Sequence, residues 1–535
     1  MSLLSSTRTM AVGTVASRAT GFLRTAVFAA VLGVQGVSVA FNVANTAPNI
    51  VYDLLLGGVL TSIVVPLLVR AAKDDDGGEA YTQRLLSLTL VVLGAASVLL
   101  VLLAPQLVDL YASDKVSAAD RDLAVVFARF FLPQVLFYGA GAVMGAYLNT
   151  RGRYSPPMWA PVLNNVVVIV TGLLFLLVPG PAKLASDTIT TTQIFVLGIG
   201  VTLGIVAQTV ALLPSLHAAG FRFRFRLDVR GAGLGPAARL ARWTFLYVVF
   251  NQVAFLVVVR LATGSSAVSG DRGYPSYIYA YLLWQLPHAV VAVSVITALL
   301  PAMSRAAADG RTADLRARLD RGMRLTVSVL VPAAIAYVVL GRAVATVVFA
   351  HGETTVAQAQ FIGVLLAVFA VGLVPFSAYQ LQLRAFYALQ DTRTPTLINL
   401  SVNVTLIAAD VVLYATLPND LKVVGLAAGQ TLSFLVGLAV CSAVLARRVP
   451  RDPRARVART AVRCLVATLP AAAVAAVAAT TCDRLLGTGL VGAVATLVVG
   501  GGVLGVGYTV TARRLRITEF DEVAGPVLRR LARSR

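Results

Sequence analysis

Two arginines lie inside the first apolar segment of the chain that is long enough to cross a membrane. Arg18 and Arg24 fall within residues 10–34, which are otherwise mostly apolar or small. Six residues of helix separate them by ~9 Å along the axis. A charged side chain at the centre of a bilayer costs about 2.5–3.5 kcal/mol on insertion scales, so it needs water, a counter-charge or an anionic ligand. The pair therefore predicts a site for a negatively charged group; the alternatives are that one arginine reaches the interface or pairs with Asp53.

Polar side chains also recur along the second apolar segment. Asn42, Asn45, Asn49 and Asp53 follow one another at intervals of three or four residues, which places them on one helix face. We interpret this face as a substrate-binding surface, with hydrogen bonding to a neighbouring helix as the alternative. An approach of Asp53 to the arginines would weaken their attraction for an anion.

A further polar stripe lies in residues 275–303. Tyr281 and Gln285 share a face with Tyr277 and His288. Tyrosine faces suit sugar rings, so we assign Tyr281 and Gln285 to the substrate site, although such a stripe also suits packing.

An ion site has weaker candidates near the C-terminal end of the chain. Asn403 and Asp410 share a face of the segment 395–417, and Thr431 lies in the next segment. Oxygen ligands suit a hard cation such as Na⁺, and an acid at this depth could exchange a proton instead. We expect no cofactor, but the sequence leaves open coupling to the membrane potential or to a Na⁺ or H⁺ gradient.

The elements that must position these residues are membrane-spanning helices. Hydrophobic residues make up 58% of the 535 positions and charged residues 13%, whereas about a quarter of a soluble protein is charged. We expect an all-α polytopic protein with about fourteen transmembrane helices. The predicted spans are roughly 10–34, 37–69, 85–112, 123–149, 157–179, 192–218, 237–262, 275–303, 323–349, 357–388, 395–417, 421–446, 458–481 and 487–511.

The distribution of basic residues predicts the orientation. The net charge is +21, and placing both termini in the cytosol puts 34 of the 45 lysines and arginines on that side. This excess faces anionic membrane lipids, as does the alternating segment Phe221-Arg-Phe-Arg-Phe-Arg226. Nucleic acid is not an expected partner, because the basic residues lie in short loops between spans. We expect a multi-pass protein of the bacterial inner membrane.

Short sequence words recur at an offset of 239 residues. Pro156 and Asn164 correspond to Pro395 and Asn403. An even number of spans per repeat gives two halves of the same orientation, a parallel pseudo-repeat. We therefore expect six-helix lobes at 1–230 and 231–450, two additional helices at 451–511 and a basic amphipathic cytosolic tail at 512–535.

Four longer motifs occur in a fixed order along the chain. They are Ser17-Arg18-x-x-Gly21-Phe22-x-Arg24, Ala40-Phe41-x-x-Ala44-x-x-x-Pro48-Asn49, Pro161-Val162-Leu163-Asn164 and Ala385-Phe386-Tyr387-Ala388-Leu389-Gln390-Asp391-Thr392-Arg393-Thr394-Pro395. In these motifs the chain resembles the bacterial MurJ/MviN lipid II flippases of the multidrug/oligosaccharidyl-lipid/polysaccharide (MOP) exporter superfamily, from about residue 8 to 511.

The resemblance implies a central cationic cavity and an export activity. The cargo of such a protein is undecaprenyl-diphosphate-linked MurNAc-GlcNAc-pentapeptide, lipid II, which it moves to the outer leaflet. The resemblance also implies that Arg18 and Arg24 bind the diphosphate. A guanidinium fork suits that role because it donates paired hydrogen bonds to phosphate oxygens and stays charged.

Several positions depart from the family pattern. Val39 replaces the usual Asp, Tyr52 and Asp53 replace a pair of Arg, and Gly57-Gly58 replaces Glu-Gly. The expected alternatives are therefore a flippase for another polyprenyl-linked glycan, or a non-transporting membrane scaffold that binds cell-wall synthesis proteins. The sequence contains no Gly-x4-Gly-Lys-Ser/Thr motif and no nucleophile or metal-ligand pattern, so we do not expect an enzyme.

Overall fold

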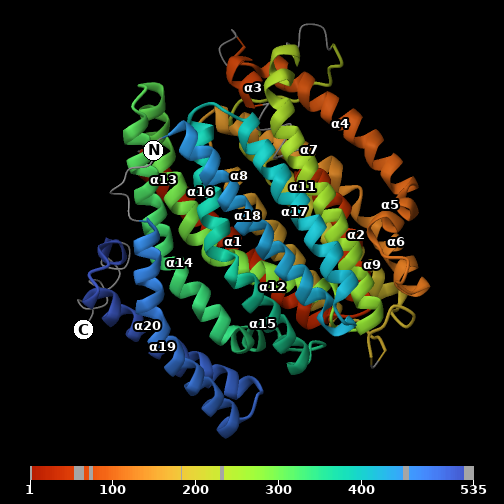
Figure 1. The fold of residues 1–535 in the computed structure, drawn as a ribbon. Helices are drawn as coiled ribbons and strands as arrows, with labels where there is room; N and C mark the ends of the chain where they lie inside the picture. Colours follow the sequence, from red (N-terminus) through yellow and green to blue (C-terminus); the bar gives the residue numbers. More distant parts are fainter. Residues whose placement is uncertain are drawn as a thin grey trace. The chain divides into compact units, whose positions relative to one another are not determined.

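The computed structural model describes residues 3–53, 65–71, 76–181, 183–228, 234–449 and 457–522. These residues fold into helices joined by short turns and contain no β-strand (Figure 1). The chain divides into two compact units, Met1–Gly270 and Asp271–Arg535, and each unit is described by itself.

The first unit consists of the helices that precede Gly270. They are α1 (Leu3–Leu32), α2 (Val37–Asp53), α3 (Val65–Ala71), α4 (Glu79–Leu102), α5 (Ala104–Tyr111), α6 (Ala118–Phe131), α7 (Gln134–Thr150), α8 (Ser155–Phe175), α9 (Thr191–Val210), α10 (Leu213–Ala218) and α11 (Leu234–Ser269). Within this unit α1 packs on α8, α8 on α9, α2 on α6, and α4 on α7.

The second unit repeats this scheme and extends it. Its elements are α12 (Tyr274–Pro287), the π-helix η2 (His288–Ala292), α13 (Val293–Ala308), α14 (Thr312–Phe349), α15 (Val356–Val371), α16 (Leu373–Ala388), α17 (Arg393–Thr416), the 3₁₀ turn η3 (Asn419–Leu421), α18 (Lys422–Arg448), α19 (Val457–Leu486) and α20 (Leu490–Arg514). Here α12 packs on α15, α14 on α16, and α17 on α18, while the hairpin of α19 and α20 packs on α14.

The helices confirm the predicted all-α membrane fold. Twelve described helical segments are long and apolar enough to cross a membrane, and α15 with α16 forms a thirteenth candidate that bends by 46°. The predicted span 37–69 contains residues 54–64, which lie outside the described residues; Gly57 and Gly58 are among them. The predicted count of about fourteen is consistent with this arrangement.

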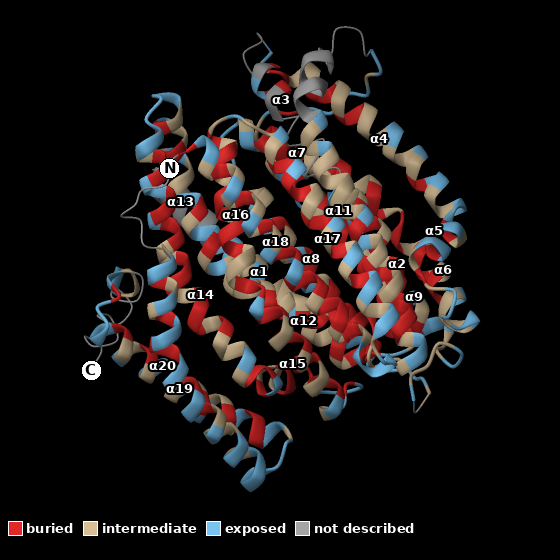
Figure 2. Cartoon of the chain, viewed as in Figure 1, coloured by how far each residue is buried: buried red, intermediate tan, exposed pale blue. Residues whose placement is uncertain are grey.

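Many large apolar side chains on these helices are exposed. Leu102 at the end of α4 is 70% exposed and Val498 on α20 is 69% exposed. Figure 2 shows such exposed positions along α4, α19 and α20. This surface would be unfavourable in water but suits hydrocarbon, since lipid chains are as apolar as the side chains they meet.

Corresponding helices of the two units end in the same way. The N–H of Arg153 donates to Leu148 O after α7, and the N–H of Asp391 donates to Phe386 O after α16, both at 2.9 Å. Gly152 and Gln390 have φ values of +70° and +58° within these turns. This bond from the second residue beyond the cap, with a left-handed residue before it, is the Schellman motif. Both helices therefore end in the same type of turn.

The domain boundary expected from the sequence stays a prediction. Helix order assigns α11 to the second lobe, whereas its contacts with α2 and α5 group it with the first unit. The predicted tail at 512–535 is described only as far as residue 522.

Two prolines inside apolar helical segments have different effects on the helix. α2 continues through Pro48 as far as Asp53, whereas Pro287 is followed by the π-helical turn η2. A proline removes one backbone donor from the preceding turn, and the Leu283 carbonyl, four residues before Pro287, instead accepts from the Tyr337 hydroxyl at 2.9 Å.

Candidate functional site

The two arginines of α1 lie in different environments. Arg18 is exposed and Arg24 is half-buried. None of the ion pairs among the described residues includes either side chain. Arg24 instead interacts electrostatically with Tyr138 of α7. A half-buried guanidinium beside a phenol, without an acid to pair with, keeps its charge available for an anionic ligand.

The polar face of α2 is partly used within the protein. The Asn42 amide donates to Ser38 O at 2.7 Å, one turn back in the same helix. Asn45 is half-buried, while Asn49 and Asp53 are exposed. The exposed part of this face is therefore the end nearest Asp53.

Asp53 does not form an ion pair with Arg18 or Arg24. Its side chain hydrogen-bonds that of Gln252 on α11. Tyr138 also interacts electrostatically with Tyr52 and Asp53, and the Tyr52 and Tyr138 ring centroids are 4.5 Å apart. We call Arg24, Tyr52, Asp53, Tyr138 and Gln252 the Tyr138 cluster.

The Tyr138 cluster draws on four helices of the first unit. α1 supplies the cation, α2 a carboxylate and a phenol, α7 a phenol and α11 an amide. A phosphate group could accept hydrogen bonds from the guanidinium and phenol donors, and the carboxylate would oppose its approach. The sequence identified Arg24 and Asp53 as site residues but not Tyr138 or Gln252.

Tyr281 and Gln285 of α12 hydrogen-bond each other through their side chains. The Tyr281 ring also lies 5.1 Å from Trp284 and 5.7 Å from Phe369, measured between centroids. Trp284 is fully buried and stacks on Phe434 of α18. This environment suits packing as well as sugar contact, so the assignment of these two residues to a substrate site stays a prediction.

The candidate ion ligands are buried but point to different neighbours. The Asn403 amide donates to Asn399 Oδ1 at 3.0 Å, and the Thr431 hydroxyl donates to Val368 O at 3.1 Å on α15. Asp410 is fully buried against Gly429 of α18. Both of its carboxylate oxygens lack a hydrogen-bond partner within the described part of the chain.

These residues do not form a ligand cage of the usual kind. No group of three or more His, Cys, Asp or Glu side chains that could hold a metal occurs in the residues described. Asp410 is nevertheless a buried acid that needs a proton or a cation for neutrality.

The fold is shared with solved transporters. A solved structure of lipid II flippase MurJ in the inward closed conformation has a TM-score of 0.73 and 17% identity, and the match covers 95% of this chain and 99% of that one. An inward-facing multidrug resistance MATE family transporter of the MOP superfamily has a TM-score of 0.67 and 15% identity, with 81% and 94% covered. The class that this fold defines is the polytopic, all-helical membrane proteins.

Sequence similarity narrows the class to a family. The family described as lipid II flippase MurJ matches residues 28–523. The lipid II flippase MurJ of Burkholderia cenocepacia is 28% identical over 459 residues, covering 83% of each chain. The probable lipid II flippase MurJ of Rhizobium meliloti is 27% identical over 417 residues, covering 76% of this chain and 75% of the relative. The chain belongs to the lipid II flippase MurJ family.

Proposed function

We propose that this protein moves lipid II from the inner to the outer leaflet of the bacterial inner membrane by alternating access. Membership in the lipid II flippase MurJ family supports this function. The observation that carries it is Arg24, a half-buried cation on a membrane-spanning helix with no acid in ion-pair contact among the described residues. A site of this kind is suited to a diphosphate and unsuited to a cationic drug.

The cargo's diphosphate binds at the Tyr138 cluster. Arg24 provides the charge-assisted fork, and the phenols of Tyr138 and Tyr52 provide additional donors. Arg18, about two turns earlier on the exposed part of α1, meets the diphosphate before or after Arg24. Asp53 limits how tightly the anion is held, which favours release.

Orientation and energy supply complete the proposal. Both termini face the cytosol, because the basic residues concentrate in the connections on that side. Asp410 carries the coupled ion, either H⁺ or Na⁺, since a fully buried carboxylate without hydrogen bonds to its oxygens is unstable as a bare charge. Anionic lipids and cell-wall synthesis proteins are its further partners.

The test is rescue of cells that have been depleted of their own lipid II flippase. Wild-type protein should restore growth and outer-leaflet lipid II, and Arg24→Ala should lower the rate of lipid II appearance by about 10- to 100-fold, because a charged hydrogen bond to phosphate contributes about 1.5–3 kcal/mol. Arg24→Lys should rescue poorly, since an ammonium lacks the planar fork.

The matched control is Arg129→Ala on α6, which removes an exposed arginine of the same unit from another span. It should leave transport unchanged. Normal lipid II transport by Arg24→Ala would reject the diphosphate site. Growth without outer-leaflet lipid II, in cells carrying wild-type protein, would favour a scaffold, and accumulation of a different polyprenyl-linked glycan would identify another cargo.

A further inference from the structure

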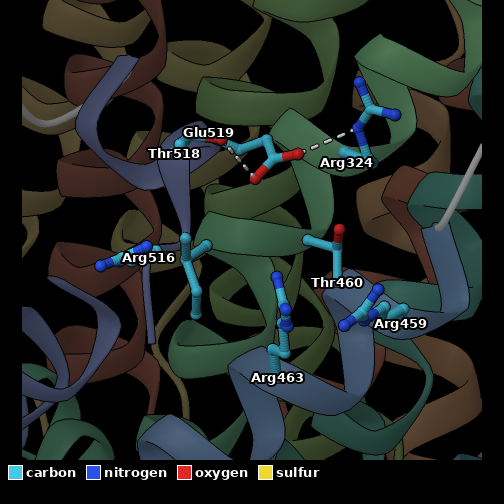
Figure 3. Close-up of a pocket in the computed structure, with 8 residues that line it drawn as sticks. Arg324, Arg459, Thr460, Arg463, Arg516, Thr518 and Glu519 are labelled. Carbon is cyan, nitrogen blue, oxygen red and sulfur yellow. Dashed lines mark hydrogen bonds and ion pairs between the residues drawn. The ribbon is translucent and has the colours of Figure 1, made fainter. Parts of the chain in front are cut away.

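A cavity rich in arginine lies in the second unit, where α14, α19 and the turn after α20 meet. Figure 3 shows side chains that line it. Its volume is about 150 Å³. Four arginines and one acid account for the charges that line it, namely Arg324, Arg459, Arg463, Arg516 and Glu519. None of these residues belongs to the Tyr138 cluster or to the candidate ion ligands.

The backbone around the cavity is firmly positioned. Arg459 and Arg463 lie one turn apart on α19, so both project from the same side of the helix. The Tyr508 hydroxyl donates to Ser328 O at 2.6 Å and joins α20 to α14. The Thr511 hydroxyl donates to Ala467 O at 2.7 Å and joins α20 to α19.

The turn that follows α20 brings Arg516 to the cavity. The N–H of Ile517 donates to Ala512 O at 3.0 Å, and Ile517 is buried with Cys464 and Tyr508 in one apolar cluster. Arg516 has a φ of +52°, a left-handed conformation that usually selects Gly or Asn. This turn places Arg516 at the wall of the basic cavity.

The positive charge of the cavity exceeds the acid available to balance it. Glu519 forms an ion pair with Arg324, with 2.9 Å between Arg324 Nε and a carboxylate oxygen, and accepts a hydrogen bond from the Thr518 hydroxyl at 3.3 Å. Two nearby acids are already paired, Asp521 with Arg513 and Glu522 with Arg321. Among the ion pairs of the described residues, none includes Arg459, Arg463 or Arg516.

The flanking sequence does not supply the missing acid. Residues 450–456 contain three arginines and one aspartate, and residues 523–535 contain four arginines and no acid. The cavity is therefore a concentrated cationic site, and guanidinium groups in such a cluster favour phosphate through paired, charge-assisted hydrogen bonds.

Size and surroundings restrict the ligand further. A volume of about 150 Å³ is enough to accommodate a phosphate group. Apolar residues between and after these arginines on α19 are exposed: Val462 is 57%, Val466 55% and Leu469 56% exposed. Phosphate at the cavity and acyl chains along this face together match an anionic phospholipid.

We propose that this cavity binds the phosphate of an anionic phospholipid headgroup, with the acyl chains lying against the exposed face of α19. The binding is independent of the cargo and of the Tyr138 cluster. The proposed membrane orientation of the protein determines only which leaflet supplies the lipid. With both termini in the cytosol, the inner leaflet supplies it.

Lipid retention by the full-length protein tests the site. The protein is first incorporated into nanodiscs of phosphatidylcholine with phosphatidylglycerol and is then released from the discs. Native mass spectrometry counts the phosphatidylglycerol molecules that stay bound to it. The double variant Arg459→Gln/Arg463→Gln should retain it at least about tenfold more weakly, because both guanidinium contacts are lost. The matched control Arg318→Gln/Arg514→Gln removes two exposed arginines from α14 and α20 and should behave as wild type.

A second variant acts in the opposite direction. Glu519→Gln releases Arg324 from its acid partner and should strengthen phosphatidylglycerol retention. This arm remains informative if the double arginine variant folds poorly, which its melting temperature in phosphatidylcholine discs would reveal. Equal retention by wild type and the cavity variant, or weaker retention by Glu519→Gln, would overturn the proposal.

A third arm separates lipid from free anion. Millimolar inorganic phosphate should neither displace phosphatidylglycerol nor raise the melting temperature in phosphatidylcholine discs. Displacement by phosphate alone would assign the cavity to a soluble anion and overturn the lipid assignment. Arg24→Ala should keep wild-type lipid retention, so a failure of the transport proposal is distinguishable from a failure at this cavity.

Discussion

Single residues of the Tyr138 cluster carry opposite charges that do not form an ion pair. Asp53 is hydrogen-bonded to Gln252 and interacts electrostatically with the Tyr138 phenol. The Tyr138 phenol also interacts with Arg24. An arriving diphosphate would meet the favourable field of the guanidinium and the unfavourable field of the carboxylate together. Affinity at this site is therefore set by a balance, and the balance can be shifted without removing the cation.

Asp53→Asn should strengthen binding of the diphosphate headgroup by about three- to tenfold, since it removes one like charge at close range. An asparagine can still hydrogen-bond Gln252, so the melting temperature should change little. Binding of a soluble headgroup analogue and thermal unfolding are measured on the same samples, with Asp53→Glu as the charge-preserving control. Unchanged affinity together with a clear loss of stability would make Asp53 a packing residue.

Asp410 allows a separate experiment on energy coupling. Asp410→Asn should remove the dependence of lipid II transport on an imposed H⁺ or Na⁺ gradient, because a neutral amide neither exchanges a proton nor neutralises a cation. Transport is measured in vesicles with each gradient in turn. Asp187→Asn, which changes an exposed acid of the first unit, is the control. Retained gradient dependence in Asp410→Asn would exclude Asp410 as the coupling group.

At the residue scale, the sequence identifies the charged residues of the site better than the neutral residues that contact them. Arg24 and Asp53 stand out because a charge within an apolar span needs an explanation. Tyr138 and Gln252 do not stand out, since tyrosine and glutamine occur in many spans and α7 and α11 are apolar around most of their circumference. A helix without a polar stripe gives no sign of which side meets its neighbour.

At the scale of elements, the turn between α16 and α17 contains an acid that pairs with an arginine of α18. In the turn between α16 and α17, Asp391 accepts from the Thr394 N–H at 2.9 Å, from the Thr394 hydroxyl at 2.6 Å and from Arg448 of α18 at 2.7 Å. Burial acts to raise the pKa of Asp391, but the Thr394 hydrogen bonds and the Arg448 charge outweigh it and hold the pKa below its ordinary value. The ionised carboxylate thus fastens three helix ends together.

A depressed pKa makes this contribution to stability depend on pH. The contribution is complete above the ordinary aspartate pKa and is lost as pH falls through the lower folded-state value. At pH 7, Asp391→Asn should lower the free energy of unfolding by about 1 kcal/mol, and the difference from wild type should shrink below about pH 4. Thermal unfolding across this pH range measures it, with Asp420→Asn in the exposed pair with Arg272 as control. A difference that grows on acidification would contradict this account.

Element positions were more predictable than element shapes. Hydropathy indicates where a span is, but it does not report the 46° bend between α15 and α16 or the turn between α6 and α7. Both breaks leave the apolar composition of the span unchanged. Only local signals such as Pro133 and Gly372 mark these positions, and such residues also occur in continuous helices of this chain, as Pro48 does in α2.

The orientation of the whole protein in the membrane can be tested by cysteine labelling. The background is a variant with Cys441, Cys464 and Cys482 changed to Ala. In it, a single Ala267→Cys near the C-terminal end of α11 should react with an impermeant maleimide added outside intact cells. Ala308→Cys at the end of α13 should react only after permeabilisation. Both positions are exposed, so access from each side decides the result. The reverse labelling pattern would invert the topology and the direction of export.

At the largest scale, the all-helical membrane fold follows from the sequence because each span must satisfy its own backbone in lipid. Schellman turns follow α7 and α16, shortly before Pro156 and Pro395. The basic cavity was not predicted, since its arginines lie on α14, α19 and the turn after α20, far apart in sequence. Only the one-turn spacing of Arg459 and Arg463 hinted at it.

The π-helical turn His288–Ala292 affects how this protein is compared with its relatives. Such a turn is a one-residue insertion that a helix has absorbed without a loop. A relative whose corresponding span is regular α-helix therefore needs a one-residue gap opposite residues 288–292. An ungapped alignment would rotate every assignment beyond this turn by about 100°, and would pair lipid-facing positions of one protein with protein-facing positions of the other.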